Sequence, residues 1–404
     1  MTPEALYASP NALAPHYRHF RVADRLLLTG HSHQAWPDVG LEAQQRAWLD
    51  AAEYADDKWV LAFAQADRVR RGFAELLDDP DGGGAIALGV NTHELLVRWL
   101  SALPFARRRR LVTTTGEFHT IRRQLDRLAE EGITVLKVAA LPAATLAERL
   151  AQAVDDRTAA VLVSAVLYEN AHIVPGLPRV YAACRQVGAE LLVDAYHALG
   201  VVPFSLRRDG LAEAFVVGGG YKYCQLGEGN CFLRIPPNCT LRPVITGWFS
   251  EFESLARDDE REPRALVGYG AGAARFAGAT YDPTSHYRAA RVFDFFHAHG
   301  LSGDLLRRVS QHQVGLLADR FDALGVDPTL VRRDRTVTLT DVGGFLALQS
   351  PRAEELCRGL KRRGVLADYR ADLLRLGPAP YLSDEQLGAA MDALGSVVGA
   401  LARG

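Results

Sequence analysis

The feature of this sequence that most constrains its fold is a regular alternation of short apolar runs with amphipathic segments between residues 84 and 220. Several of the runs are apolar at nearly every position, which is typical of strands that helices cover on both faces of a sheet. The alternation predicts an α/β fold with a mostly parallel, doubly wound sheet. The predicted strands are 85–89, 111–115, 134–138, 160–164, 190–194 and 215–217, with helices between them that include 120–131, 144–154 and 179–187.

The length of the chain and the pattern after residue 220 predict two lobes. At 404 residues the chain exceeds the usual size of one domain. A long helix that starts near Pro283 would connect the large lobe to a smaller α+β lobe. We predict an N-terminal arm (1–45), a large domain (46–284) and a small C-terminal domain (285–404). The later predicted elements are strands at 230–235, 336–339, 344–348 and 374–376, and helices at 352–363 and from Ser383 onward.

The composition describes an ordinary water-soluble protein. Hydrophobic residues make up 48% of the chain, charged residues 23%, and the net charge is −2, so neither nucleic acid nor a membrane is expected as a partner. The start of the chain lacks the basic and apolar blocks of a signal peptide. The five cysteines form no C-x-x-C pair, which favours reduced thiols and a cytoplasmic location. His31 and His33 have no carboxylate-rich partner segment, so we predict no metal site.

Two of the apolar runs are followed by polar residues that an ordinary core would not select. Asp194 closes one run, and Lys222 follows the other behind three glycines. Ligands of open α/β sheets bind outside the carboxyl ends of the strands, where both side chains are expected. An acid and a lysine in this order suit pyridoxal phosphate, whose aldehyde forms a Schiff base with lysine and whose ring nitrogen an acid keeps protonated. A surface lysine and a helix-capping aspartate are the alternatives, but capping explains Asp194 without explaining Lys222 beside it.

The turn at residues 89–94, with the sequence Gly-Val-Asn-Thr-His-Glu, is a second candidate ligand site. It follows a predicted strand and opens a predicted helix over 95–103. Free N–H groups at a helix start, together with the side chains of Asn91 and Thr92, would hold a phosphate group. A plain N-cap with a capping box explains the same residues equally well, so both interpretations stay open.

In chain order these segments resemble those of the fold-type I, class V pyridoxal phosphate enzymes, and within that class the chain looks most like kynureninase. The resemblance extends over most of the length and includes Asp-Ala-Tyr-His at 194–197, Tyr-Lys-Tyr at 221–223, Gly-Trp-Phe at 247–249 and Arg-x-Gly at 375–377. It implies the aspartate aminotransferase-like fold, pyridoxal phosphate as cofactor, a small amino acid substrate, and a homodimer whose active sites take residues from both subunits.

The resemblance also implies roles for individual residues. Lys222, Tyr221 and Asp194 would be catalytic, and Arg375 would bind the substrate α-carboxylate, with His31 and Ser32 also facing the substrate. The implied cofactor-binding residues are Val90, Asn91, Phe118, Asn170, Asp194, His197, Tyr221, Lys222, Trp248 and Thr280.

The sequence departs from the kynureninase pattern mainly around the expected substrate. Gly-His-Ser-His-Gln at 30–34 replaces Gly-Asn-Ser-Leu-Gly, and Ala165, Leu167 and Glu169 replace His, Asn and Arg. Neutral drift and a different substrate both explain these changes. The resemblance therefore implies hydrolytic Cβ–Cγ cleavage of a kynurenine-type substrate, while transamination, elimination, another lyase reaction or a catalytically silent pyridoxal phosphate protein remain alternatives. Desulfuration is disfavoured, because the desulfurase family places a nucleophilic cysteine in a loop near the carboxylate-binding arginine and residues 375–381 contain none.

Overall fold

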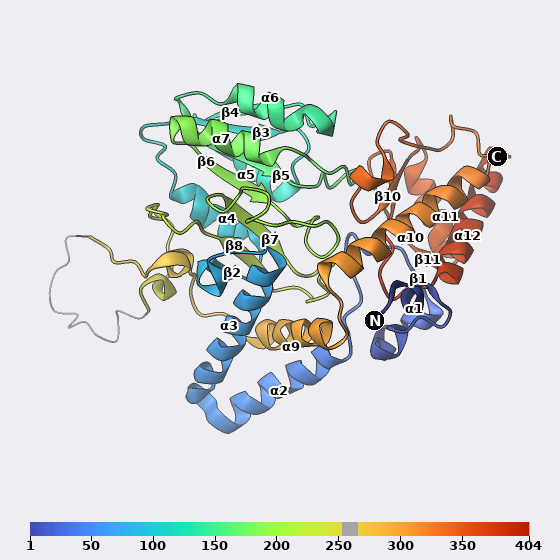
Figure 1. Ribbon diagram of the computed structural model, residues 1–404, viewed down its shortest axis with the longest axis horizontal. Helices are drawn as coiled ribbons and strands as arrows, with labels where there is room; N and C mark the ends of the chain where they lie inside the picture. Colours follow the sequence, from blue (N-terminus) through green and yellow to red (C-terminus); the bar gives the residue numbers. More distant parts are fainter. Residues whose placement is uncertain (253–265, 404) are drawn as a thin grey trace.

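The computed structural model describes residues 1–252 and 266–403. Its larger lobe is built on a seven-stranded sheet with the strand order β2-β8-β7-β6-β5-β3-β4 (Figure 1). The strands from β4 to β7 in this order run parallel, and β8 is antiparallel to both of its neighbours. The expectation of a mostly parallel sheet is confirmed. The strands are β2 (Ile86–Gly89), β3 (Arg110–Thr114), β4 (Thr134–Val138), β5 (Thr158–Ser164), β6 (Glu190–Asp194), β7 (Phe215–Gly219) and β8 (Cys231–Arg234).

Helices cover both faces of this sheet because successive strand residues point to opposite sides. On β6, Leu192 belongs to an apolar cluster with the helices α4 (Thr92–Ser101) and α5 (His119–Glu130). Val193 belongs to a second cluster with α3 (Lys58–Leu76), α6 (Leu146–Ala153) and α7 (Leu177–Val187). The near-continuous apolar runs of the sequence are therefore strands buried on both faces. In the described residues, no helix is both long and apolar enough to cross a bilayer.

The C-terminal part of the chain forms a second, antiparallel sheet of order β12-β13-β10-β9, which packs with three helices (Figure 1). The final helix begins at Ser383 as predicted, through a capping box in which Ser383 and Gln386 satisfy each other's backbone N–H groups. The elements are α10 (Gly303–Ala323), β9 (Arg332–Arg333), β10 (Leu346–Gln349), α11 (Ala353–Arg362), β11 (Val365–Leu366), β12 (Asp368–Arg370), β13 (Leu373–Leu376) and α12 (Asp384–Ala402).

The strand predicted at 336–339 is wrong. Its residues form bends that lead into a short 3-10 turn at Leu339–Asp341, and the edge strand of the sheet lies earlier, at β9. The carboxylate of Asp334 accepts both the N–H and the hydroxyl of Thr336, at 2.8 and 2.6 Å. Such local side-chain bonds compete with the pairing of a strand, which is why a β-branched run here does not join the sheet.

The N-terminal residues lie against the C-terminal lobe, although their sequence shows no period of its own (Figure 1). The helix α1 (Pro3–Tyr7) packs on α10, and β1 (Leu26–Leu27) pairs in parallel with β11. The chain then passes into α2 (Val39–Tyr54), which packs with α3 against α9 (Thr284–Ala298). The helix predicted from Pro283 is thus confirmed as α9, whereas the domain boundaries at residues 45 and 284 stay a prediction.

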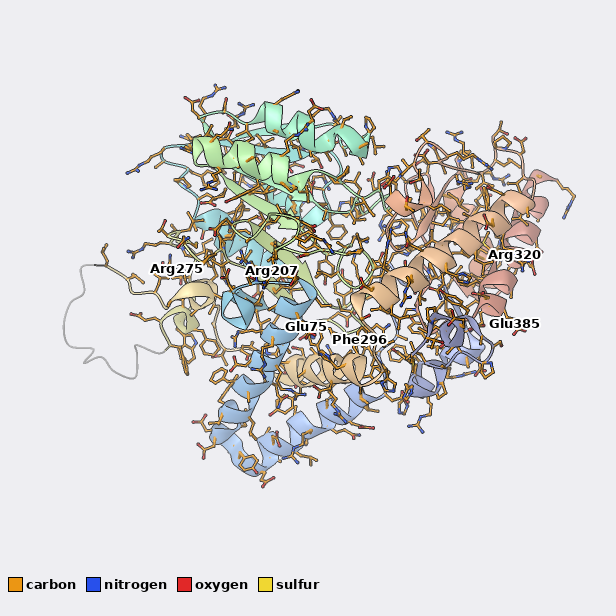
Figure 2. All side chains as sticks on the ribbon, viewed as in Figure 1. Glu75, Arg207, Arg275, Phe296, Arg320 and Glu385 are labelled. Carbon is orange, nitrogen blue, oxygen red and sulfur yellow. The ribbon has the colours of Figure 1, made fainter. Side chains whose placement is uncertain are left out.

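We expect Arg234→Ala to lower the free energy of unfolding by about 3–5 kcal/mol, because the change leaves a buried carboxylate without its cation. Arg234 is fully buried, and its Nε and Nη2 donate to the equally buried Asp79, each at 2.9 Å. The matched control is Arg207→Ala, because Arg207 is exposed (labelled in Figure 2) and lies 3.8 Å from Asp78. The control should cost less than about 1 kcal/mol. Urea unfolding measures both, and equal losses for the two variants would contradict this account.

Candidate active site

A cavity of about 270 Å³ opens at the carboxyl ends of the parallel strands, where the sequence placed the ligand. It contains the side chains that follow β6 and β7 and the residues that start α4 and α5. The predicted site residues that line it are Val90, Asn91, Phe118, Asp194, His197, Tyr221 and Lys222. These residues are far apart in the sequence, and the sheet brings them together as expected.

Lys222 is held inside this cavity by the chain that follows β7. Gly219 and Gly220 lead into it, and a Cβ atom on either would lie 2.4 Å or less from Tyr196 Oη or Leu226 Cδ1. The lysine is 7% exposed, and its Nζ lies 2.7 Å from His197 Nε2. Burial lowers the pKa of Lys222 to about 7, against the opposing effect of Asp194. A neutral amine that can attack a carbonyl is therefore abundant near pH 7.

Asp194 and His197 both act on the amine of Lys222. Asp194 ends β6, and its Oδ1 accepts the N–H of Tyr196 at 2.8 Å. Burial raises the pKa of Asp194 to about 6, while that N–H and Lys222 act in the opposite direction. Burial also lowers the pKa of His197 well below its usual range, and Lys222 adds to this. His197 is thus a neutral imidazole, whose buried Nδ1 has no hydrogen-bond partner among the described residues.

Aromatic rings surround the amine of Lys222. The ring centroids of Tyr196, Phe118 and Tyr221 lie 5.2, 5.6 and 5.7 Å from Nζ. Phe118 also meets Tyr168 edge to face at 5.3 Å. The cavity therefore has flat apolar walls beside a nucleophile, which suits an aromatic or heteroaromatic ligand.

The residues at the start of α4 also line the cavity. Val90, Asn91, Thr92 and His93 line the cavity, and Asn91 caps the helix by accepting the N–H of Glu94 at 2.9 Å. The capping interpretation of Asn91 is confirmed. It does not exclude the anion site, because a capped helix still directs the N–H groups and positive dipole end of its first turn toward a ligand.

Arg375 belongs to a separate network beside the cavity. Its Nε and Nη2 donate to the two oxygens of Asp368 at 2.9 and 2.5 Å, and its Nη1 donates to the carbonyl of Tyr168 at 2.6 Å. His31 Nε2 lies 2.7 Å from the same carboxylate. Burial alone would raise the pKa of Asp368, but the bonds from His31 and Arg375 hold it well below its usual range. Burial in turn lowers the pKa of His31 to about 4, so its ring is neutral and donates to Asp368.

Besides Arg375 and His31, four further predicted site residues lie outside the cavity. Asn170 accepts the N–H of His172 in a turn after β5, and Ser32 Oγ lies 3.1 Å from Nδ1 of His33, whose ring stacks on Tyr221. Trp248 is exposed and packs on a neighbouring aromatic ring. Thr280 lines a different cavity of about 850 Å³. The contacts that the resemblance implies for these four stay predictions.

Comparison with known proteins finds relatives in sequence and in structure. Residues 330–394 match the kynureninase C-terminal domain family. The kynureninase of Pseudomonas fluorescens is 26% identical, over 96% of this chain and 93% of its own length. That of Burkholderia pseudomallei is 29% identical, over 91% and 88%. A solved variant of the cystine C-S lyase C-DES, with glycine covalently linked to its pyridoxal phosphate cofactor, matches with a TM-score of 0.80 at 17% identity, over 94% of this chain and 98% of that one. The cysteine desulfurase CsdA of Escherichia coli matches with a TM-score of 0.76 at 16% identity, over 99% of each chain.

The chain has the fold-type I, class V architecture, and its sequence is similar to that of kynureninases. The predicted fold and resemblance are confirmed. The segment that matches the kynureninase C-terminal domain contains β12 and β13, and thus both Asp368 and Arg375.

Two site residues are missing from the sequence-based prediction. Glu117 is buried beside Phe118, and Asp368 joins Arg375 to His31. Both residues belong to segments that resemble kynureninase, Glu117 to 116–120 and Asp368 to 364–370. Nothing local indicates that Asp368 will bond His31, which lies 337 residues away along the chain.

We expect Asp368→Asn to lower the free energy of unfolding by about 3 kcal/mol at pH 7, because it leaves the buried Arg375 without its anion. The folded-state pKa of Asp368 is depressed, so its contribution is complete above about pH 4. Below that pH the difference between wild type and variant should shrink by up to about 1.4 kcal/mol per pH unit, as the unfolded state takes up the proton.

Urea unfolding between pH 3 and pH 8 measures this difference. The control is Glu75→Gln on α3, which removes the carboxylate of an exposed pair with His297 at 3.0 Å (Glu75 is labelled in Figure 2). The control should change the free energy of unfolding by less than about 1 kcal/mol. A loss for Asp368→Asn that does not change with pH would show that packing, not the carboxylate charge, is responsible.

Proposed function

We propose that this chain binds pyridoxal phosphate through Lys222 and acts on an amino acid, by hydrolytic cleavage of the Cβ–Cγ bond of a kynurenine-type substrate. The observation that carries the proposal is the buried amine of Lys222, whose pKa of about 7 leaves it reactive between aromatic rings and Asp194. Pyridoxal phosphate, when bound, supplies an aldehyde for this amine and a ring that takes up the electron pair released at the substrate Cα.

The residues of the cavity fit this cofactor. Phe118 offers a flat face for the ring, and Asp194 offers a carboxyl group that can ionise against a protonated ring nitrogen. The start of α4 offers N–H groups for the phosphate. His197 Nδ1 adds a buried polar atom with no partner among the described residues. Amine, acid, ring face and anion site thus meet in one cavity.

The protein's own residues then have distinct roles in the reaction. Lys222, once its amine is free, can take the proton from the substrate Cα, because it is a base with a pKa near neutrality. Burial raises the pKa of Tyr221 to about 12, so its hydroxyl keeps its proton at neutral pH and can pass it to the substrate. Arg375, aimed by Asp368, would bind the α-carboxylate. The aromatic walls would hold the substrate side chain and restrict water to the carbon under attack.

Kynureninase-like hydrolysis is supported by relatives that match nearly the whole chain and by the match of residues 330–394. A lyase or aminotransferase acting on another amino acid is the second candidate. It is favoured by the structural similarity to a cystine lyase and by an uncharacterized aminotransferase of Bacillus subtilis that is 22% identical over 85% of this chain. The rim of the cavity also differs from the kynureninase pattern, since His33 of the changed segment 30–34 stacks on Tyr221 and lies 3.5 Å from Glu228.

We further propose a cytoplasmic homodimer that completes its sites across the interface. Trp48, Val60 and Val244 are each more than 70% exposed in the single chain, which is unusual for large apolar side chains. Thr280 lines the cavity of about 850 Å³, which does not include Lys222 but shares Val90 with the cavity that does. All five cysteines are free thiols, which fits a reducing compartment.

The first test is the purified protein with added pyridoxal phosphate. We expect a visible absorption band that is lost in Lys222→Ala, because Lys222 is the one lysine among the described residues that lines the cavity. Lys361→Ala, at an exposed lysine of α11, is the control and should keep the band. The same samples are assayed for release of alanine and an aromatic acid from kynurenine and 3-hydroxykynurenine.

These outcomes separate the two levels of the proposal. A band that persists in Lys222→Ala would contradict the cofactor site. A band without release of either product would leave the cofactor in place and exclude kynureninase activity. Cysteine, cystine and common amino acids are then the substrates to screen for the second candidate.

We expect the capture of pyridoxal phosphate by the apoprotein to depend on pH through the protonation of Lys222. Only the neutral amine attacks the aldehyde, so the second-order rate should rise with pH and level off above a midpoint near pH 7. Stopped-flow absorbance at constant ionic strength measures the rate. Nα-acetyl-lysine is the reference, whose rate should keep rising to about pH 10. A midpoint near pH 10 for the protein would show that burial does not activate Lys222.

A further inference from the structure

We propose that Glu117 is a positioning residue that acts through Ser164 and Asp194 to keep the ring nitrogen of the bound cofactor protonated. The proposal rests on the binding of pyridoxal phosphate proposed above. Glu117 lies between β3 and α5, directly before Phe118, and is 2% exposed. It is not among the residues that line the cavity, whereas Ser164 and Asp194 are. Its influence on the cofactor must therefore pass through these two neighbours.

Hydrogen bonds fix the carboxyl group of Glu117 at the ends of two strands. Its Oε1 accepts the hydroxyl of Thr114 at 2.6 Å and the N–H of Ser164 at 3.2 Å. Its Oε2 accepts the hydroxyl of Ser164 at 2.6 Å. Three donors aimed at one carboxyl group are the environment of an ion, because the charged form is the one that accepts every bond.

Ser164 connects the carboxyl group of Glu117 to Asp194. Ser164 and Asp194 are partners in the parallel register of β5 and β6, and paired strands lie about 5 Å apart. The N–H of Ala165 also donates to the carbonyl of Asp194 at 2.8 Å. Two carboxyl groups are therefore connected through Ser164, that of Asp194 in the cavity lining and that of Glu117 outside it.

The balance of charges makes this second carboxyl group active near neutral pH. Burial raises the pKa of Glu117 to about 7, the hydroxyls of Ser164 and Thr114 lower it, and Asp194 raises it again. Asp194 on β6 is the titratable group that acts on Glu117 from a neighbouring element, and Lys222 acts in turn on Asp194. Glu117 therefore gains its negative charge as the pH rises through about 7.

A buried negative charge stabilises a nearby proton on a cation. Ionisation of Glu117 near pH 7 adds a negative charge next to the cavity. A ring nitrogen that only Asp194 stabilised would lose its proton more readily in this pH range. Glu117 would thus extend the protonated range of the nitrogen toward alkaline pH. A clamp between β3 and β5 is the simpler role for the same hydrogen bonds, and it makes a different prediction. Loss of a clamp lowers stability but leaves the titration of the nitrogen unchanged.

The test is Glu117→Gln in the holoenzyme, with cofactor labelled with ¹⁵N in its ring. The amide keeps the size of the side chain and removes its charge. NMR of the ring nitrogen as a function of pH reports its protonation directly. We expect the pH at which the nitrogen loses its proton to fall by about one unit, the effect of one charge removed at several ångströms in a protein interior.

The matched control is Glu190→Gln. Glu190 lies at the opposite end of the same strand as Asp194, and burial raises its pKa as well. Its removal should leave the titration of the nitrogen unchanged, because it is a strand length away from the cavity. An equal fall in both variants would mean that any carboxyl group of the sheet acts alike, and it would overturn the specific role of Glu117.

Thr114→Val is a second variant, used if Glu117→Gln does not fold. It removes one donor to Glu117, keeps the carboxyl group, and should shift the titration of the nitrogen in the same direction by a smaller amount. An unchanged titration in whichever variant folds would overturn the proposal while leaving cofactor binding intact. A wild-type protein that does not bind the labelled cofactor would instead overturn the proposed function, and this proposal with it.

Discussion

The parallel register of β5, β6 and β7 is the constraint on which the site depends. It places Ser164 beside Asp194 and Asp194 beside Val217, so three strands end at the same edge. The chain beyond β7 then needs only a few residues to bring Lys222 to that edge. A slip of one residue would turn Asp194 away from the cavity, and the two separate apolar clusters on the faces of the sheet oppose it. The core thus fixes the position of the acid.

Burial shifts the pKa of four groups in or next to the cavity toward the neutral form. It lowers the pKa of Lys222 and His197 and raises that of Asp194 and Glu117. The amine is thereby ready to attack a carbonyl, and the acids stay near the pH at which they ionise. Burial therefore accounts both for the nucleophilic amine of Lys222 and for two carboxyl groups, of Asp194 and Glu117, that ionise near neutral pH. A ligand with a cationic ring nitrogen would complete the balance, because it favours the charged form of Asp194.

The sequence predicts this site well where a signal is local. Asp194 and Lys222 stand out because each follows an apolar run, and the glycines before Lys222 are needed where the backbone packs closely on Tyr196 and Leu226. The turn before α4 is equally visible, although a helix cap and an anion site look alike in sequence.

Contacts between distant segments are what the sequence does not predict. Nothing near His31 indicates a bond to Asp368, and nothing near Glu117 indicates that Ser164 will lie against it. Ala165 and Leu167, which differ from the kynureninase pattern, are buried in the apolar core, whereas Val166 and Tyr168 between and beside them line the cavity. The run at 336–339 has the composition of a strand, but hydrogen bonds to Asp334 hold it in bends. In each case the outcome depends on neighbours that only the folded chain supplies.

Lys222 and Arg375, which are proposed to act in the reaction, are buried, whereas residues at the rim of the cavity are exposed. Lys222 and Asp194 line the cavity and Glu117 is buried next to it, and each acts on the pKa of its neighbour. Arg375 is also fixed, because Asp368 occupies one edge of its guanidinium and a backbone carbonyl takes a further donor. This arrangement favours orientation of a carboxylate over strong attraction, since the charge of Arg375 is already shared.

The rim of the cavity differs from its buried interior in exposure. His33 and Glu228 form an exposed pair above Tyr221, on segments that the sheet does not constrain. Both side chains are more than half exposed, so a substitution there leaves Lys222 and Asp194 in place. The first departure from kynureninase to examine is therefore His33, because it is the exposed histidine of segment 30–34, whereas His31 is buried and bonded to Asp368.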